Sequence, residues 1–484
     1  MITKRFIKSS IIYTIAGSLP MASAIILLPF YLGYLSASNF GVLSVFTGIS
    51  ALIQVFVTYS FDTAIYSYYH DYKNDPKKLA AFVTSIFIFI LILGGAVCVL
   101  STLTGPLVYG LFFAKVKISF YPYGLLSVIT GIFQSVFKVF SNLLQAQEKA
   151  DRFLRSNLFL FTTIALFTIL GLYFFPDDLL GPIGGRMLAL TISTVWVITR
   201  VYLQFGFQFD KAIIKKMLGF NQPILLYQIL QWANVYYDRL LMSRYLPLSS
   251  VGVYDLAVKC LMALEFIVAG FNSSFLPRVL GAIALQREKK TTVEINRYYN
   301  GLTAVSIILV ALSIFTLPLI IEWMVQWFHK PDYLKAVPLI PWVATGYLFR
   351  SMRLYVAMPY AALKNSRPLP IYYSVVIGLK IGMMVWLMNL YGIPGVIYSA
   401  WIGYLVEVLI LYWGIENKFE FKFNTTKLVI APVLFGILIV AVEPLLGIRF
   451  PYLAHTIYLV VAAIVLFWAY RNELKNIEWV KILK

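Results

Sequence analysis

Eleven charged side chains lie deep within apolar stretches, away from their ends, where a charge near the bilayer centre costs about 2.5–3.5 kcal/mol on membrane-insertion scales. Six of them are cations, namely Lys138, Arg239, Lys259, Arg350, Arg353 and Lys380. Five are acids, namely Asp62, Asp238, Asp255, Glu265 and Glu407. Charges kept at such a cost usually pair with one another or face a hydrated cavity that binds a substrate or an ion.

Arg350 and Arg353 are the strongest candidates for a binding role. They stand three residues apart, so a helix presents them on one face, and Arg350 lies about 20 Å into a segment that starts near residue 337. No acid lies within one helical turn of either arginine. Guanidinium groups bind phosphate oxygens in a bidentate manner, so the pair predicts a site for a pyrophosphate.

The other intramembrane charges have both a binding and a structural interpretation. All six cations are candidate substrate-binding residues, and Asp62 and Glu265 are candidate ion-coupling residues. Structural alternatives are an ion pair between Asp255 and Lys259 at i,i+4, interface anchoring by Asp238 and Arg239, an ion pair between Lys380 and Glu407, and snorkelling of Lys138.

The amino-acid composition indicates that these charges lie within a membrane. The 484 residues are 60% hydrophobic, 17% aromatic and only 13% charged, which excludes a water-soluble enzyme. Fourteen apolar stretches are each long enough to cross a bilayer. They are 9–32, 40–66, 79–103, 119–146, 157–175, 184–203, 219–245, 250–276, 297–321, 337–362, 369–390, 393–416, 426–446 and 452–471. The first lacks a small-residue cleavage pattern, so we expect a membrane span rather than a removed signal peptide.

Basic residues are concentrated in alternate loops. One side of the predicted topology carries 27 Lys and Arg residues and the other carries seven, among them Arg186. The positive-inside rule therefore predicts that both termini are cytoplasmic. This bias accounts for most of the net charge of +19, so no nucleic-acid partner is needed to explain it.

The sequence offers neither a metal centre nor a cofactor motif. Cys98 and Cys260 lie in apolar stretches, and His70, His329 and His455 are far apart along the chain. No G-x-x-x-x-G-K-[ST] loop is present, so ATP hydrolysis by this chain is not expected. We therefore expect no cofactor and no metal.

An internal repeat divides the predicted spans. Gly41 and Gly252 stand in similar segments 211 residues apart, and the pair Gly181/Gly184 matches Gly392/Gly395 at the same offset. Lys138 and Arg353 are related by 215 residues. Six spans separate equivalent positions, so the copies are parallel, as in transporters whose two lobes rock around a central cavity. The predicted organisation is a six-helix lobe over 1–210, a second over 211–420, and two further helices over 421–484.

Several short motifs resemble the polysaccharide-exporting Wzx-type flippases of the multidrug/oligosaccharidyl-lipid/polysaccharide superfamily. They are 35–41 (LSASNFG), 220–223 (FNQP), 237–239 (YDR), 252–254 (GVY) and 271–277 (FNSSFLP). The resemblance covers nearly the whole chain and implies a cavity between two lobes and transport of undecaprenyl-pyrophosphate-linked oligosaccharide. In that family the first, second, seventh and eighth spans line the cavity, which favours Asp62, Arg239, Lys259 and Glu265.

The sequence thus predicts an all-α polytopic membrane protein and a flippase, not an enzyme, in the bacterial cytoplasmic membrane. Expected partners are the lipid-linked oligosaccharide, membrane lipids, a polysaccharide polymerase and glycosyltransferases. Two alternatives remain: a drug/cation antiporter of the same superfamily, and a membrane-embedded oligosaccharide polymerase or ligase. The energy source is open between proton exchange, sodium exchange, the membrane potential and downhill flow.

Overall fold

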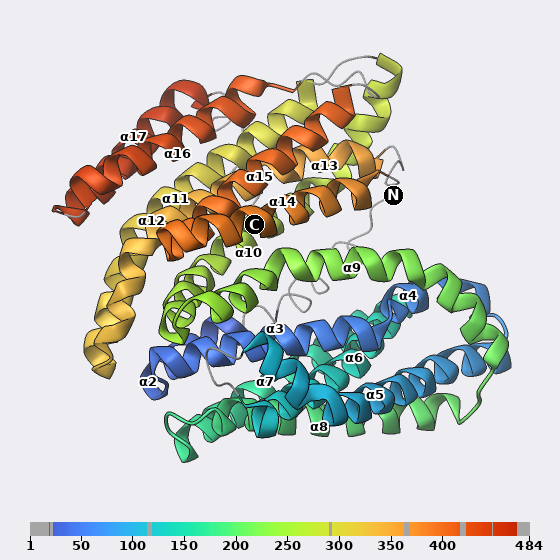
Figure 1. Ribbon diagram of the computed structural model, residues 1–484. Helices are drawn as coiled ribbons and strands as arrows, with labels where there is room; N and C mark the ends of the chain where they lie inside the picture. Colours follow the sequence, from blue (N-terminus) through green and yellow to red (C-terminus); the bar gives the residue numbers. More distant parts are fainter. Residues whose placement is uncertain are drawn as a thin grey trace. The chain divides into compact units, whose positions relative to one another are not determined.

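The computed structural model describes residues 19, 23–113, 119–289, 293–362, 368–416, 423–447 and 449–471. Throughout these ranges the secondary structure is helical, and the helices group into fourteen consecutive segments (Figure 1). Ten of the described segments are long and apolar enough to cross a membrane. The prediction of an all-α polytopic membrane protein with about fourteen spans is therefore confirmed.

The chain divides into two compact units, residues 1–255 and 256–484. The first unit holds α2 (Leu28–Tyr34), α3 (Ala37–Thr58), α4 (Phe61–Tyr72), α5 (Pro76–Phe112), η1 (Phe120–Gly124), α6 (Leu125–Ala146), α7 (Ala150–Phe174), α8 (Leu180–Phe205), α9 (Lys211–Tyr245) and the start of α10 (Leu248–Lys289). The predicted boundary between repeat lobes at residue 210 stays a prediction.

The second unit continues α10 and adds the remaining helices. They are α11 (Val293–Phe328), η2 (Pro331–Leu339), α12 (Ile340–Ser351), α13 (Arg353–Ala362), α14 (Leu369–Tyr391), α15 (Ile393–Glu416), η3 (Thr426–Ile430), α16 (Ala431–Val442), η4 (Glu443–Gly447) and α17 (Pro451–Ala469). Within this unit α14 packs along α15, as α7 packs along α8 in the first unit. The two helix pairs occupy equivalent places in the predicted repeat.

Polar caps fix where several helices begin. The Ser36 hydroxyl accepts a hydrogen bond from the backbone N–H of Asn39 at the start of α3, and Asp210 accepts from Ala212 and Ile213 at the start of α9. Asp75 does the same for α5 by accepting from the N–H groups of Lys78 and Lys77. The hydrogen bond from the Lys78 N–H is the main reason that the pKa of Asp75 lies below its usual value.

Residues that the predicted repeat makes equivalent meet where α3 contacts the first turn of α10, inside the first unit. A Cβ on Gly41 would overlap the carbonyl oxygen of Leu248, and a Cβ on Gly252 would overlap that of Ala37. Both contacts join residues that are equivalent under the 211-residue offset, so the contact is reciprocal, as at a two-fold axis. The glycines are kept small because two helix backbones touch there.

Two of the spans that were predicted as continuous are interrupted. The second is broken at Tyr59 and Ser60, which have φ values of 45° and 58°, so α3 ends at Thr58 and α4 begins at Phe61. The tenth has a one-residue turn at Met352, whose backbone keeps right-handed helical dihedrals, between α12 and α13. Breaks inside membrane helices are typical of the binding sites of transporters.

Candidate functional site

The break between α12 and α13 positions both candidate arginines. Arg350 occupies the last turn of α12 and Arg353 is the first residue of α13. The N–H of Met352 donates to the carbonyl of Phe349, three residues back, which tightens the turn between them. The carbonyls at the end of α12 carry partial negative charge and favour a cation such as Arg350 at that position.

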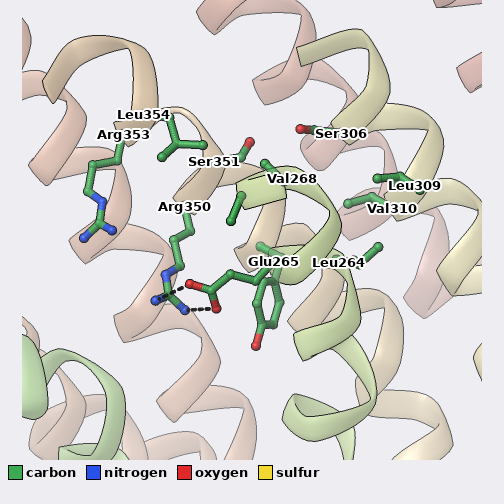
Figure 2. A pocket seen from close by; sticks show the side chains of 12 residues that line it. Leu264, Glu265, Val268, Ser306, Leu309, Val310, Arg350, Ser351, Arg353 and Leu354 are labelled. Carbon is green, nitrogen blue, oxygen red and sulfur yellow. Dashed lines mark hydrogen bonds and ion pairs between the residues drawn. The ribbon is translucent and has the colours of Figure 1, made fainter. Parts of the chain in front are cut away.

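Arg350 forms a bidentate ion pair with Glu265 of α10 (Figure 2). Its Nη1 lies 2.9 Å from Oε2, and its Nη2 lies 2.8 Å from Oε1. The side chains are 19% and 30% exposed, respectively, so the pair is reachable rather than sealed. Glu265 therefore holds the guanidinium in an orientation that suits a two-oxygen ligand.

The Arg350–Glu265 pair borders a pocket inside the second unit. The pocket has an empty volume of about 680 Å³, which includes the open space at its mouth. Its lining is largely apolar, from α10 and α11, and its charged groups are Glu265 from α10, Arg350 from α12 and Arg353 from α13 (Figure 2). The lining residues are Leu264, Glu265, Val268, Ala269, Ser306, Leu309, Val310, Tyr347, Arg350, Ser351, Arg353 and Leu354. An apolar pocket with a few convergent charges is typical of a ligand site.

Arg353 reaches the same pocket but pairs more loosely. Its Nη1 lies 3.6 Å from Oε1 of Glu407 on α15, and that oxygen has no hydrogen-bond partner among the described residues. Glu407 is only 3% exposed, whereas Arg353 is 23% exposed. Arg353 can therefore turn towards a ligand at a smaller cost than Arg350.

Lys380 lies deeper in the second unit and is 1% exposed. Its ammonium lies 4.0 Å from the ring centroid of Tyr404, which is a cation–π contact, and its stem crosses Gly403. The structure pairs Glu407 with Arg353, while the predicted Lys380–Glu407 pair stays a prediction.

The break after α3 positions Asp62 in the first unit. Asp62 lies in the first turn of α4, where exposed N–H groups favour an anion. Its Oδ2 lies 3.1 Å from Nζ of Lys138 on α6, and its Oδ1 accepts a hydrogen bond from the Gln228 amide at 3.3 Å. The structure therefore joins a candidate coupling acid to a candidate substrate cation.

The Asp62–Lys138 pair makes a specific prediction. Lys138→Met should lower the thermal stability of the purified protein, because Asp62 is buried and would lose its cation. The effect should be about 1 kcal/mol or less, since the Lys138 side chain is 34% exposed. Adding Asp62→Asn should restore the melting temperature, and a double variant that melts below both single variants would contradict the pairing.

Arg239 belongs to a buried network that joins α9 to the start of α10. Its Nη1 lies 2.7 Å from Oδ1 of Asp238, and its Nε lies 3.1 Å from Oδ1 of Asp255. Tyr254 donates a hydrogen bond to Asp238, and Nη1 also donates to the carbonyl of Val235. With Arg239 only 7% exposed, this geometry favours a structural role. Lys259 lies half-buried on α10 in the second unit.

Two side chains of interest were not among the predicted site residues. Arg186, counted with the loop cations, lies within α8, where the Gln134 side-chain oxygen accepts hydrogen bonds from its Nη2 at 2.7 Å and its Nε at 3.3 Å. Glu443 lies buried at the end of the thirteenth segment. Glu443 could have been identified from the sequence, because it is an acid near the end of the apolar stretch 426–446.

Comparison with known proteins gives a family and a fold. Residues 6–280, more than half of the chain, match the model of the family described as polysaccharide biosynthesis protein. A curated relative is the "Lsg locus putative protein 1" of Haemophilus influenzae, with 21% identity over 74% of this chain and 83% of the relative. Another is the "Putative O-antigen transporter" of Shigella flexneri, with 21% identity over 48% of this chain and 54% of that protein, about half of its length.

Solved structures with a similar fold are transporters. The lipid II flippase MurJ in an inward closed conformation matches with a TM-score of 0.72 and 15% identity, covering 96% of this chain and all of that one. An inward-facing multidrug resistance transporter of the MATE family matches with a TM-score of 0.64 and 13% identity, covering 82% and 94%. At these identities the likeness establishes the fold.

Proposed function

Because the chain belongs to the polysaccharide biosynthesis protein family, we propose that it flips undecaprenyl-pyrophosphate-linked oligosaccharide across the cytoplasmic membrane by alternating access. The cargo would supply surface polysaccharide synthesis. A relative named as an O-antigen transporter and a similar fold named as a lipid II flippase both support a lipid-linked cargo. The product would be the same molecule on the other side of the membrane, so the chain would not act as an enzyme.

The single observation that carries the proposal is the partly exposed Arg350–Glu265 pair at the edge of an apolar pocket. A pyrophosphate offers pairs of oxygens with a geometry like that of the Glu265 carboxylate. It can therefore replace Glu265 as the bidentate partner of the Arg350 guanidinium. Glu265 would then neutralise and orient Arg350 while the site is empty. The looser Arg353 would contribute a second fork.

The alternatives fit the same charges less well. An antiporter of organic cations needs an acidic pocket, whereas the residues that line this pocket include two arginines, Arg350 and Arg353, and one acid, Glu265, which is paired with Arg350. An oligosaccharide polymerase or ligase is expected to carry a large outer loop with basic catalytic residues. The loops predicted on the outer side are short and sparsely charged.

The proposed setting is the bacterial inner membrane, with both termini in the cytoplasm. The two predicted six-helix lobes would rock around a central cavity that shelters the polar headgroup while the prenyl tail stays in lipid. Membrane lipids would surround the chain. Glycosyltransferases that build the cargo and a polymerase that consumes it are the proposed functional partners.

Loss of the gene should separate these possibilities. A flippase null should lose most surface glycan and accumulate undecaprenyl-pyrophosphate-linked units on the inner leaflet, because the pyrophosphate headgroup cannot cross the bilayer unaided. Surface glycan and lipid-linked intermediates would be quantified in the null and in the complemented strain. Normal delivery of the units with altered polymer length would favour a polymerase, and a change confined to drug tolerance would favour an antiporter.

A further inference from the structure

The last two membrane segments hold a buried carboxyl that the proposed cargo site does not use. Glu443 begins η4, directly after α16, and is 7% exposed. The hydroxyl of Tyr458 on α17 donates a hydrogen bond to its Oε2 at 2.9 Å. η4 is the last turn of its membrane segment and ends at Gly447.

Glu443 differs from the other buried acids in what it faces. Asp62, Asp255, Glu265 and Glu407 each have a lysine or arginine nitrogen within 3.6 Å. Glu443 has no cation within ion-pair distance among the described residues, and its hydrogen-bond partner is a neutral phenol. An ionised carboxylate there would lose hydration without gaining a counter-charge, and taking up a proton removes that cost.

A second unsatisfied group lies next to Glu443's partner. His455 stands one turn before Tyr458 on the same face of α17, with ring centroids 6.3 Å apart. It is 2% exposed, and its Nδ1 has no hydrogen-bond partner in the described structure. A neutral imidazole has one ring nitrogen that can accept a hydrogen bond or a proton.

The groups around this pair are acidic or neutral. Tyr452 of α17 donates a hydrogen bond to Glu322 of α11 at 2.6 Å. The nearest basic residue along the chain, Arg449, is exposed in the turn before α17. The described residues hold no group of three carboxyl, histidine or cysteine side chains placed to bind a metal. A proton fits this arrangement better than a metal ion.

We propose that Glu443 and His455 form a proton-binding site in the C-terminal helix pair. The two acids predicted as ion-coupling candidates, Asp62 and Glu265, each form an ion pair, at 3.1 Å with Lys138 and at 2.8 Å with Arg350. Glu443 and His455 can change charge without breaking such a pair. If the chain exports a glycan as proposed, this site supplies its proton dependence, and that step rests on the proposed function.

Infrared spectroscopy of the purified full-length protein tests proton binding without any cargo. The wild type should show a carbonyl band of a protonated carboxylic acid that Glu443→Gln removes and Tyr458→Phe shifts, because the phenol bonds to the same group. Asp332→Asn, which removes an exposed acid, should leave the band unchanged. A spectrum unaltered by Glu443→Gln would overturn the site.

Export in cells then separates proton binding from a structural hydrogen bond. Glutamine still accepts from Tyr458, so a purely structural role predicts that Tyr458→Phe is the more damaging change. Proton coupling instead predicts that Glu443→Gln lowers export about fivefold or more and abolishes its response to external pH. Tyr458→Phe should keep that response. A pH response retained in Glu443→Gln, at equal protein level, would refute coupling while leaving the proposed cargo untouched.

Discussion

Replacing Arg350 by lysine is expected to reduce glycan export about ten- to a hundredfold, although the charge is kept. Lysine offers a point charge instead of a planar fork, so it cannot make both contacts seen with Glu265 or offer them to a pyrophosphate. Arg350→Ala should impair export further. Surface glycan divided by membrane-inserted protein is the measurement.

The partner of Arg350 supplies the matched control. If the ion pair only holds α12 against α10, Glu265→Gln should damage export as much as Arg350→Ala, since either change breaks the same contact. If Arg350 binds the cargo, Glu265→Gln should spare more activity, because the fork remains. Wild-type export in Arg350→Ala would eliminate the cargo role.

Arg353 is expected to tolerate substitution better than Arg350. Its single contact with Glu407 is long, at 3.6 Å, and is not bidentate. A lysine at this position therefore loses less of the original interaction than a lysine at position 350. The same ordering should appear in the alanine variants. Equal losses at both positions would mean that Arg353 contacts the cargo as directly as Arg350 does.

The number and type of elements could be predicted because the bilayer imposes them. An apolar stretch of about 20 residues must be helical to satisfy its backbone, so counting stretches gave fourteen segments. The helix breaks could not be predicted in the same way. Neither Tyr59–Ser60 nor Met352 contains glycine or proline, and tertiary packing holds Tyr59 and Ser60 at positive φ.

The candidate site was predictable in its residues but not in its pairings. A charge inside an apolar stretch is visible in the sequence, which is why Arg350, Glu265, Asp62 and Lys138 were identified. Arg350 and Glu265 are 85 residues apart along the chain, and Asp62 and Lys138 are 76 residues apart. Each pair joins two different helices, and no local sequence rule says which faces of those helices meet. The structure places Asp255 3.1 Å from Arg239, which lies 16 residues earlier on α9, and the predicted pair of Asp255 with Lys259 stays a prediction.

The contact between Gly41 and Gly252 gives the largest expected effect on stability. Gly252→Ala would place a methyl group against the carbonyl of Ala37, a backbone atom that cannot rotate away. The two helices would have to separate, at a cost of about 1–3 kcal/mol, which exceeds the gain in helix propensity. Thermal unfolding of the purified protein and its level in the membrane should both fall.

Because the contact is reciprocal, substituting both glycines tests it more strictly than substituting one. Gly41→Ala presses on Leu248 from the opposite helix, so it should destabilise the protein by a similar amount. Both changes force the same helices apart, and the double variant should therefore cost less than the sum of the single variants. Gly270→Ala, on the same helix with no atom within 4 Å of the new methyl group, should be neutral or slightly stabilising. If Gly252→Ala behaves like Gly270→Ala, α3 and α10 do not touch at these glycines, and the two-fold relation inferred from them fails.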